Sequence, residues 1–246
     1  MLFRSNTRHV ERAFFRSAHL RSPGRIENTF ANESFIDELA FAAKADPAEY
    51  RLRFLKDPRS VAVMRKVMER AKWQPRVSVN AAAGAGDVVR GRGISYLRYS
   101  NSNTYVAAVA EVAVNRKTGH IRVERVCVAH DCGLVVNPDG TINQIEGGTI
   151  QTVSRTLMEA VRWDRREVLS RDWASYPILR HDAVPRVEVD LIDRPDQLTF
   201  AAGEPTPCAI PAAIGNAVFD ATGVRLREVP FTPERVLAAL GRPLRA

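Results

Sequence analysis

The chain has 246 residues, of which 45% are hydrophobic and 26% charged, with a formal net charge of +8 at pH 7. This is an ordinary globular composition, which excludes a disordered chain, and no apolar run is long enough for a membrane-spanning helix. The three cysteines, at 127, 132 and 208, form no CxxC pair. We therefore expect no disulfide scaffold, no zinc site and no iron–sulfur cluster held by this chain alone.

The positive charge comes mainly from arginines spread along the whole chain. Arginine suits phosphate and carboxylate groups, so we expect a surface that faces an anionic cofactor or a partner. A nucleic-acid face is the weaker alternative, because no Lys/Arg-rich run or RNA-binding signature accompanies the charge. The N-terminus lacks the apolar core of a secretory signal. The expected location is cytoplasmic, with periplasmic export through a partner's signal as the alternative.

The first elements in chain order are predicted to be helices. Residues 28–43 place Phe35, Ile36 and Leu39 on one helical face. Asp46-Pro47 and Asp57-Pro58 each supply a capping aspartate and a first-turn proline. We therefore expect an irregular segment over 1–27, a helical unit of three segments over 28–73, and a Gly/Ala-rich linker over 74–91. Gly84-Ala85-Gly86 in that linker is no dinucleotide fingerprint, since no strand precedes it and no helix follows.

The remainder, residues 92–246, is predicted to be an α+β domain with a mixed sheet. Val, Ile and Tyr are enriched in strands expected at 93–99, 104–114 and 120–130, and 104–114 is apolar enough to be a central strand covered on both faces. The later elements expected are a helix over 141–161, strands at 187–192 and 198–200, a helix over 209–222, a strand at 224–229, and a last helix beginning at Thr232-Pro233.

One carboxylate stands out from the rest of the chain. Glu204 lies between Gly203 and Pro205, after a strand-like run and before an apolar, helix-like run. Reactive groups in α/β enzymes often occupy such loops, and proline stiffens the backbone that aims the side chain. On this local pattern alone, an exposed loop glutamate is the alternative reading.

A second motif, His130-Asp131-Cys132, has the residue types of a nucleophile and its base. Neighbours on a strand point to opposite faces, so we do not expect a hydrolytic dyad there. The other histidines have no spacing suited to metal binding. No side chain is predicted to coordinate a metal.

Four segments, at 20–40, 106–138, 143–151 and 201–233, are specific when taken together. They resemble the C-terminal part of the molybdenum-binding large subunit of the xanthine dehydrogenase/aldehyde oxidase family. The branch that looks most similar is the isoquinoline 1-oxidoreductase β-subunit type. The resemblance runs from about Leu20 to Leu240, in family order.

The resemblance implies a molybdenum cofactor, molybdopterin in its cytosine dinucleotide form, and hydroxylation of an aldehyde or N-heteroaromatic carbon with oxygen from water. Glu204 matches the family's catalytic base, and we expect burial to raise its pKa and make it a better base. The positions that match cofactor-binding segments are Arg21, Gln144, Gly147, Gly148, Gln151 and Gly203.

The chain also departs from the family pattern. Gln151 is followed by Thr152 rather than glycine, which puts a close backbone approach there in doubt. Ser22-Pro23 replaces Gly-Phe, so the family's aromatic substrate wall is absent there. The Met-Gly-Gln-Gly-type loop of the family occurs nowhere.

We therefore expect a fragment, or one half of a split large subunit. Its partners would be the missing N-terminal part, a small [2Fe-2S] subunit, a flavin subunit as a further candidate, and a small-molecule substrate. A non-catalytic fragment and a basic nucleic-acid-binding protein are the alternatives.

Overall fold

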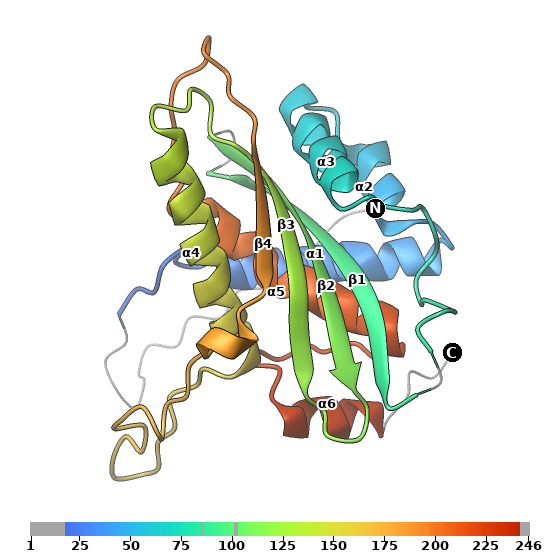
Figure 1. The fold of residues 1–246 in the computed structure, drawn as a ribbon, viewed down its shortest axis with the longest axis vertical. Coiled ribbons are helices and arrows are strands. Elements are labelled where there is room, and N and C mark those ends of the chain that lie inside the picture. The colour runs from blue at the N-terminus through green and yellow to red at the C-terminus, as the bar shows by residue number, and fades with distance from the viewer. Residues whose placement is uncertain (1–17, 85, 101–102, 242–246) are drawn as a thin grey trace.

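The computed structural model describes residues 18–84, 86–100 and 103–241. Residues 1–17 of the expected N-terminal segment, Ala85 of the Gly-Ala-Gly run, and parts of the expected 92–246 domain at 101–102 and 242–246 lie outside the described residues. Within these limits a four-stranded sheet occupies the centre and carries a hydrophobic core on each face (Figure 1).

The sheet is mixed, as predicted. Strands β1 (Val88–Tyr99), β2 (Thr104–Asn115) and β3 (Ile121–Asp131) pair antiparallel in sequence order, and β4 (Arg186–Leu191) pairs parallel to β3. Strand β2 lies between two partners and is buried on both faces, which confirms its prediction as a central strand. A parallel pair needs a long crossover, and α4 (Pro138–Leu157) lies in the connection from β3 to β4.

One face of the sheet is covered by α5 (Pro205–Thr222) together with α4. Helix α5 is buried along almost its whole length. Gly91 and Gly93 of β1 allow this close packing, because a Cβ on either would overlap the α5 backbone. Helix α1 (Arg25–Ala42) packs along α5. A last helix, α6 (Pro233–Leu240), is capped by Thr232, as expected.

The opposite face is covered by α3 (Pro58–Arg70), whose Val63, Met64 and Val67 pack against Ala107 and Val109 of β2. Helix α2 (Pro47–Phe54) follows the aspartate cap and proline start that the sequence predicted. All three helices expected within 28–73 therefore form. They wrap around the β1 edge of the sheet, with α1 beside α5 and α3 on the other face.

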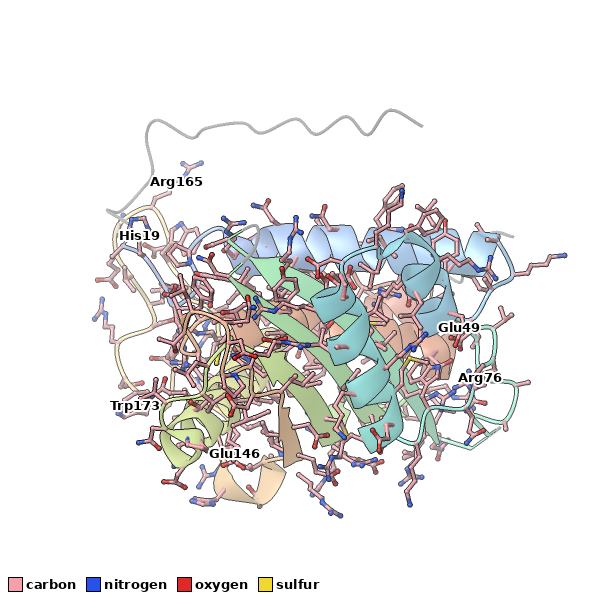
Figure 2. The ribbon with its side chains drawn as sticks, turned by 90° about the horizontal axis from the view of Figure 1, so that it is seen from above. His19, Glu49, Arg76, Glu146, Arg165 and Trp173 are labelled. Atoms are coloured by element: carbon pink, nitrogen blue, oxygen red, sulfur yellow. The ribbon has the colours of Figure 1, made fainter. Side chains whose placement is uncertain are left out.

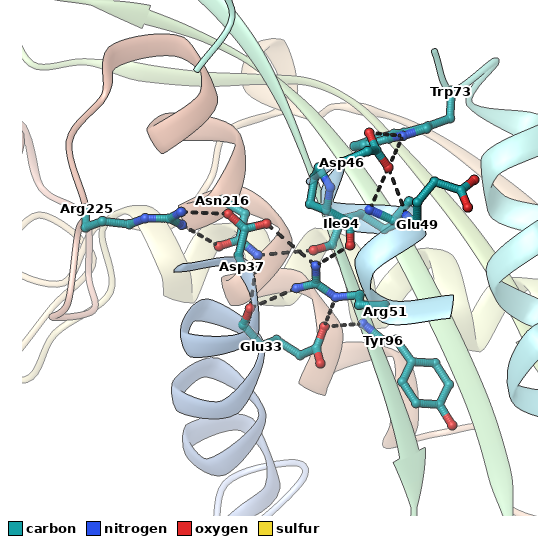
Figure 3. A network of polar contacts seen from close by, with 12 residues as sticks. Glu33, Asp37, Asp46, Glu49, Arg51, Trp73, Ile94, Tyr96, Asn216 and Arg225 are labelled. Carbon is teal, nitrogen blue, oxygen red and sulfur yellow. Dashed lines mark hydrogen bonds and ion pairs between the residues drawn. The ribbon is translucent and has the colours of Figure 1, made fainter. Parts of the chain in front are cut away.

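A buried polar network closes the outer edge of β1 (Figure 3). The Glu33 carboxylate accepts hydrogen bonds from the Tyr96 amide at 2.8 Å and from Arg51 Nε at 2.8 Å. Asn216 Nδ2 donates to Ile94 O at 3.1 Å, and Asp220 Oδ2 accepts from the Arg92 amide at 3.0 Å. Side chains of α1 and α5 thus form hydrogen bonds with backbone groups that would be free to pair with another chain if the edge strand were exposed.

Several expected boundaries and two expected strands were wrong. Residues 198–200 and 224–229 are irregular. In the second segment, the alternation arises because Arg225 and Arg227 pair with carboxylates of α1 while Leu226 is buried. Strand β1 begins inside the expected linker, because it pairs along the full length of β2. Helix α5 begins directly after Glu204 rather than at 209, and α4 spans 138–157 rather than 141–161. Among the described residues, no helix combines the length and apolarity needed to cross a membrane.

Candidate cofactor site

The carboxylate of Glu204 lies at the N-terminal end of α5 and is held from two other segments. Tyr99, the last residue of β1, donates its hydroxyl to Glu204 Oε2 at 2.6 Å. The Ser22 amide donates to Oε1 at 3.3 Å, and Ser22 Oγ donates to the Glu204 carbonyl at 2.7 Å. The side chain is therefore oriented from both sides rather than extended into solvent.

These hydrogen bonds determine the protonation states of Glu204 and Tyr99. The bond from Tyr99, followed by the bond from the Ser22 amide, holds the pKa of Glu204 below its usual value despite the opposing effect of partial burial. Burial and the bond to Glu204 raise the pKa of Tyr99 to about 12. The expectation that burial raises the Glu204 pKa was therefore wrong, because donors to the carboxylate outweigh its desolvation. At neutral pH Glu204 is ionised and Tyr99 keeps its proton.

The guanidinium of Arg21 joins three segments that are far apart in sequence. Its Nε donates to Gly203 O at 2.5 Å. Its Nη2 donates to the carbonyl and side-chain oxygens of Gln144, at 3.3 and 3.2 Å, and its Nη1 to Gln151 Oε1 at 3.5 Å. The structure thus brings Arg21, Gly203, Gln144 and Gln151 together beside Glu204, as the resemblance implied for their positions.

The two adjacent glycines of α4 have different surroundings. A Cβ on Gly148 would lie 3.1 Å from Arg21 Nη2 and 3.1 Å from Pro207 Cγ, so this glycine makes room for the arginine. A Cβ on Gly147 would meet no atom within 4 Å, and Gly147 is exposed together with Gln144 and Gln151. Gly147 therefore leaves open space between two amide side chains on the surface of α4.

A small hollow adjoins this face. Its volume is about 230 Å³, and its lining includes Asn137, Gln144, Phe200 and Ala202. Thr152, which replaces the glycine of the family pattern, is buried and donates Oγ1 to Gly148 O at 2.7 Å. The threonine therefore points into the fold and leaves the exposed face of α4 unobstructed.

Sequence reasoning missed three residues of this cluster. Tyr99 and Ser22 hold Glu204, and Arg155 acts on Arg21, whose pKa is lowered by burial and then by the charge of Arg155. Arg155 follows Gln151 by four residues, so helical spacing could have indicated it. No spacing in the sequence links Tyr99 to Glu204, because that contact depends on how α5 packs against β1.

The His130-Asp131-Cys132 motif forms no dyad. His130 is fully buried and its Nδ1 lies 3.0 Å from Thr206 Oγ1, whereas Asp131 accepts bonds from Arg59 and Arg194. Burial lowers the pKa of His130 to about 4, so it is neutral at pH 7. The prediction that these neighbours point apart is confirmed. Across 18–84, 86–100 and 103–241, no three His, Cys, Asp or Glu side chains are grouped to hold a metal ion.

The donor set fits a polar, phosphate-bearing cofactor. A guanidinium, two primary amides and an uncovered glycine line one surface, and such groups bind the heteroatoms of a pterin and its phosphates. A model of the molybdopterin cofactor-binding domain family matches residues 36–185. That is more than half of the chain, and the chain belongs to this family.

Known proteins agree with the family assignment. The chain is 45% identical over 232 residues to a nicotinate dehydrogenase subunit of Pseudomonas putida, covering 92% of this chain and 20% of that protein. It is 38% identical over 216 residues to the beta subunit of isoquinoline 1-oxidoreductase of Brevundimonas diminuta, covering 87% of this chain and 26% of that protein. The resemblance to xanthine dehydrogenase-family molybdenum subunits, including the isoquinoline 1-oxidoreductase type, is therefore confirmed.

A solved structure shows the same fold. The aldehyde oxidoreductase of Desulfovibrio gigas matches with a TM-score of 0.73 at 16% identity, over 91% of this chain and 42% of that chain. The present chain spans about a fifth to a quarter of the length of the two relatives in sequence, and less than half of this structural neighbour.

Proposed function

We propose that this chain forms the molybdenum-cofactor-binding part of a hydroxylase-type oxidoreductase that acts on an aldehyde or an N-heteroaromatic carbon. The observation that carries the proposal is the cluster in which Arg21 connects Gly203, Gln144 and Gln151 next to Glu204. The names of the relatives support the reaction class. We include the cytosine dinucleotide form of the cofactor in the proposal.

In this account, Gln144, Gln151 and the backbone around Gly147 hold the cofactor. The bound cofactor supplies the redox chemistry and the oxygen derived from water. Arg21 fixes the distance between α4 and the start of α5, because it donates to both. Gly148 accommodates that arginine, and Gly203 receives its Nε bond, so both glycines contribute indirectly.

Glu204 accepts the proton that the reaction releases. Its carboxylate is ionised at neutral pH, as a general base must be. Tyr99 and the Ser22 amide fix its orientation, and the high pKa of Tyr99 keeps that hydroxyl a donor during turnover. General-base catalysis of this kind contributes about 10²–10⁴-fold in rate.

The remaining partners belong to the same proposal. The rest of a large subunit, a small [2Fe-2S] subunit and a flavin subunit would complete the electron path, and the complex would work in the cytoplasm. The short span of this chain relative to the nicotinate dehydrogenase relative supports a need for further polypeptide.

The test of catalysis is Glu204→Gln in the complete complex. We expect turnover of an aldehyde or N-heterocycle with a dye acceptor to fall about 10²–10⁴-fold, because glutamine keeps its size but cannot accept the proton. Molybdenum content should stay near the wild-type value.

Glu159→Gln is the matched control. Glu159 accepts a hydrogen bond from Tyr176 at 2.9 Å, just as Glu204 does from Tyr99, but it follows the C-terminal end of α4. The turnover rate of the Glu159→Gln complex should match that of the wild-type complex. A Glu204→Gln complex that keeps more than roughly a tenth of the wild-type rate, outside the range for a lost base, would remove Glu204 from the catalytic role.

A further inference from the structure

A large groove lies between α1, α2 and the C-terminal end of β1. Its volume is about 890 Å³. Phe35 and Leu39 line it from α1, Tyr50 and Phe54 from α2, and Leu97 from β1. Phe54 is 66% exposed and Phe35 40% exposed, although both belong to the apolar wall. A solvated apolar surface of this kind marks an interaction site.

The groove changes character along its length. Near the start of α1 its wall is polar, with Asn28 and Asn32, and further along α1 it becomes apolar at Phe35 and Leu39. The polar end reaches Tyr99, which also lines the groove and donates to Glu204. An occupant that fills the polar end of the groove therefore contacts Tyr99 of the candidate site.

The occupant cannot simply extend the sheet. Glu33, Asn216 and Asp220 already bond to backbone groups on the outer edge of β1. Docking must use side chains placed in the groove, because backbone pairing of an added strand would first have to displace this buried network. This favours a folded, apolar-faced segment over an extended peptide.

We propose that the groove seats the part of the large subunit that lies outside this chain, through an apolar-faced segment inserted between α1 and α2. The inference rests on the proposed function. The 92% of this chain that matches the nicotinate dehydrogenase relative accounts for only 20% of that protein. In the aldehyde oxidoreductase neighbour, this fold is likewise part of a much longer chain. A fold within a longer chain buries apolar faces against the rest of it.

The test is co-purification with a defined probe. The probe is the part of the Pseudomonas putida nicotinate dehydrogenase relative outside its matched segment, tagged and co-expressed with this chain in cells that make no molybdenum cofactor. We expect wild type to be retained and a Phe35→Glu/Phe54→Glu variant to be retained at least tenfold less. Because no cofactor is present, this result is independent of whether Glu204 is the base.

The control is Trp173→Glu. Trp173 is 75% exposed and lies at the other end of the molecule from Glu49 of α2 (Figure 2). The Trp173→Glu variant should be retained as well as wild type, and all variants should keep the wild-type circular dichroism spectrum. As a second measurement, a photo-crosslinking amino acid at position 54 should capture the probe, whereas one at position 173 should not.

Three results would overturn the inference. One is equal retention of the groove variant and the control. Another is failure of the wild-type chain to retain the probe. The third is a dimer of this chain alone that the groove substitutions dissociate, since that would assign the groove to a second copy.

Discussion

At the residue scale, the ionised state of Glu204 results from hydrogen-bond donors to its carboxylate and not from a dry environment. Its pKa is lowered first by the Tyr99 hydroxyl and then by the Ser22 amide, while burial acts in the opposite direction. A base of this kind is fully ionised at pH 7 and depends on position more than on a raised pKa. Tyr99 therefore matters to the account as much as the glutamate that the sequence indicated.

The adjacent glycines of α4 give a matched pair of substitutions. In the free chain, Gly147→Ala should raise the free energy of unfolding by up to about 1 kcal/mol, because alanine favours helix and meets open space. Gly148→Ala should be less stable than Gly147→Ala by about 1 kcal/mol, since its Cβ presses on Arg21 and Pro207. Urea denaturation measures both.

In the complete complex, Gly147→Ala should lower molybdenum content, because its methyl group enters the proposed cofactor space.

The opposite order of stabilities would contradict this description of the two positions. Unchanged molybdenum content in Gly147→Ala would show that the open space at Gly147 does not receive the cofactor.

At the element scale, the junction between β3 and α5 should respond to pH. His130 is buried and neutral, with a pKa of about 4 in the folded state against 6.5 for an ordinary histidine. Below pH 6.5, His130 binds a proton in the unfolded chain. In the folded chain it binds that proton only near pH 4. The free energy of unfolding should therefore fall across this window as pH decreases, by on the order of 3 kcal/mol.

His130→Gln should flatten this slope between pH 6.5 and 4, because glutamine does not titrate. Chemical denaturation at a series of pH values, with wild type and variant compared at each, isolates the histidine, because both proteins contain the same carboxylates. Parallel curves for the two proteins would show that His130 is not held neutral by the fold.

The network at the edge of β1 should matter more than a surface ion pair. The side chains of Glu33 and Arg51 are only 5% and 2% exposed. Glu33→Gln leaves Asp37, at 3.6 Å, as the ion-pair partner of Arg51, which keeps its bonds to the carbonyls of Pro47 and Glu33. The loss of the buried Glu33 charge should cost about 3 kcal/mol of folding stability. The control is Glu69→Gln, which removes an exposed pair with Lys66 and should change stability by less than about 0.5 kcal/mol. Equal effects in thermal unfolding would contradict the structural role of the network.

Local signals explain which elements the sequence could predict. Asp46-Pro47 and Asp57-Pro58 fixed the starts of α2 and α3, and the continuous apolar run of β2 indicated burial on both faces. Of the two strands wrongly expected near the C-terminus, residues 224–227 alternate as predicted but have no neighbouring strand, whereas Leu198 in the other segment is 78% exposed. Alternation reports which side chains are buried: Leu226 joins the main hydrophobic core, while Arg225 and Arg227 pair with carboxylates of helix α1.

The candidate site shows the same limit. Arg21, Gln144 and Glu204 were found because each lies in a segment that resembles a family motif. Tyr99 and Ser22 were missed because their contacts with Glu204 span 105 and 182 residues and depend on tertiary packing. The direction of the Glu204 pKa could not be predicted without them.

At the scale of the whole molecule, part of the arginine excess serves the fold itself. Arg51, Arg76 and Arg225 pair with the buried carboxylates of Glu33, Asp220 and Asp37. These cations are therefore not available to a nucleic acid. Two surface features, the proposed cofactor face of α4 and the groove beside Tyr99, point toward a larger assembly.

The central claim is that the exposed face of α4 binds the molybdenum cofactor, and molybdenum analysis of the purified protein tests it most directly. The complete complex should contain near-stoichiometric molybdenum, and this chain alone should contain little, because one side of the site is open. Gln144→Ala/Gln151→Ala in the complex should lower the molybdenum-to-protein ratio at least tenfold. Glu146 projects from another side of the same helix, so Glu146→Ala should leave the molybdenum-to-protein ratio unchanged. A double variant with wild-type molybdenum content, or a full complement in the isolated chain, would contradict the account.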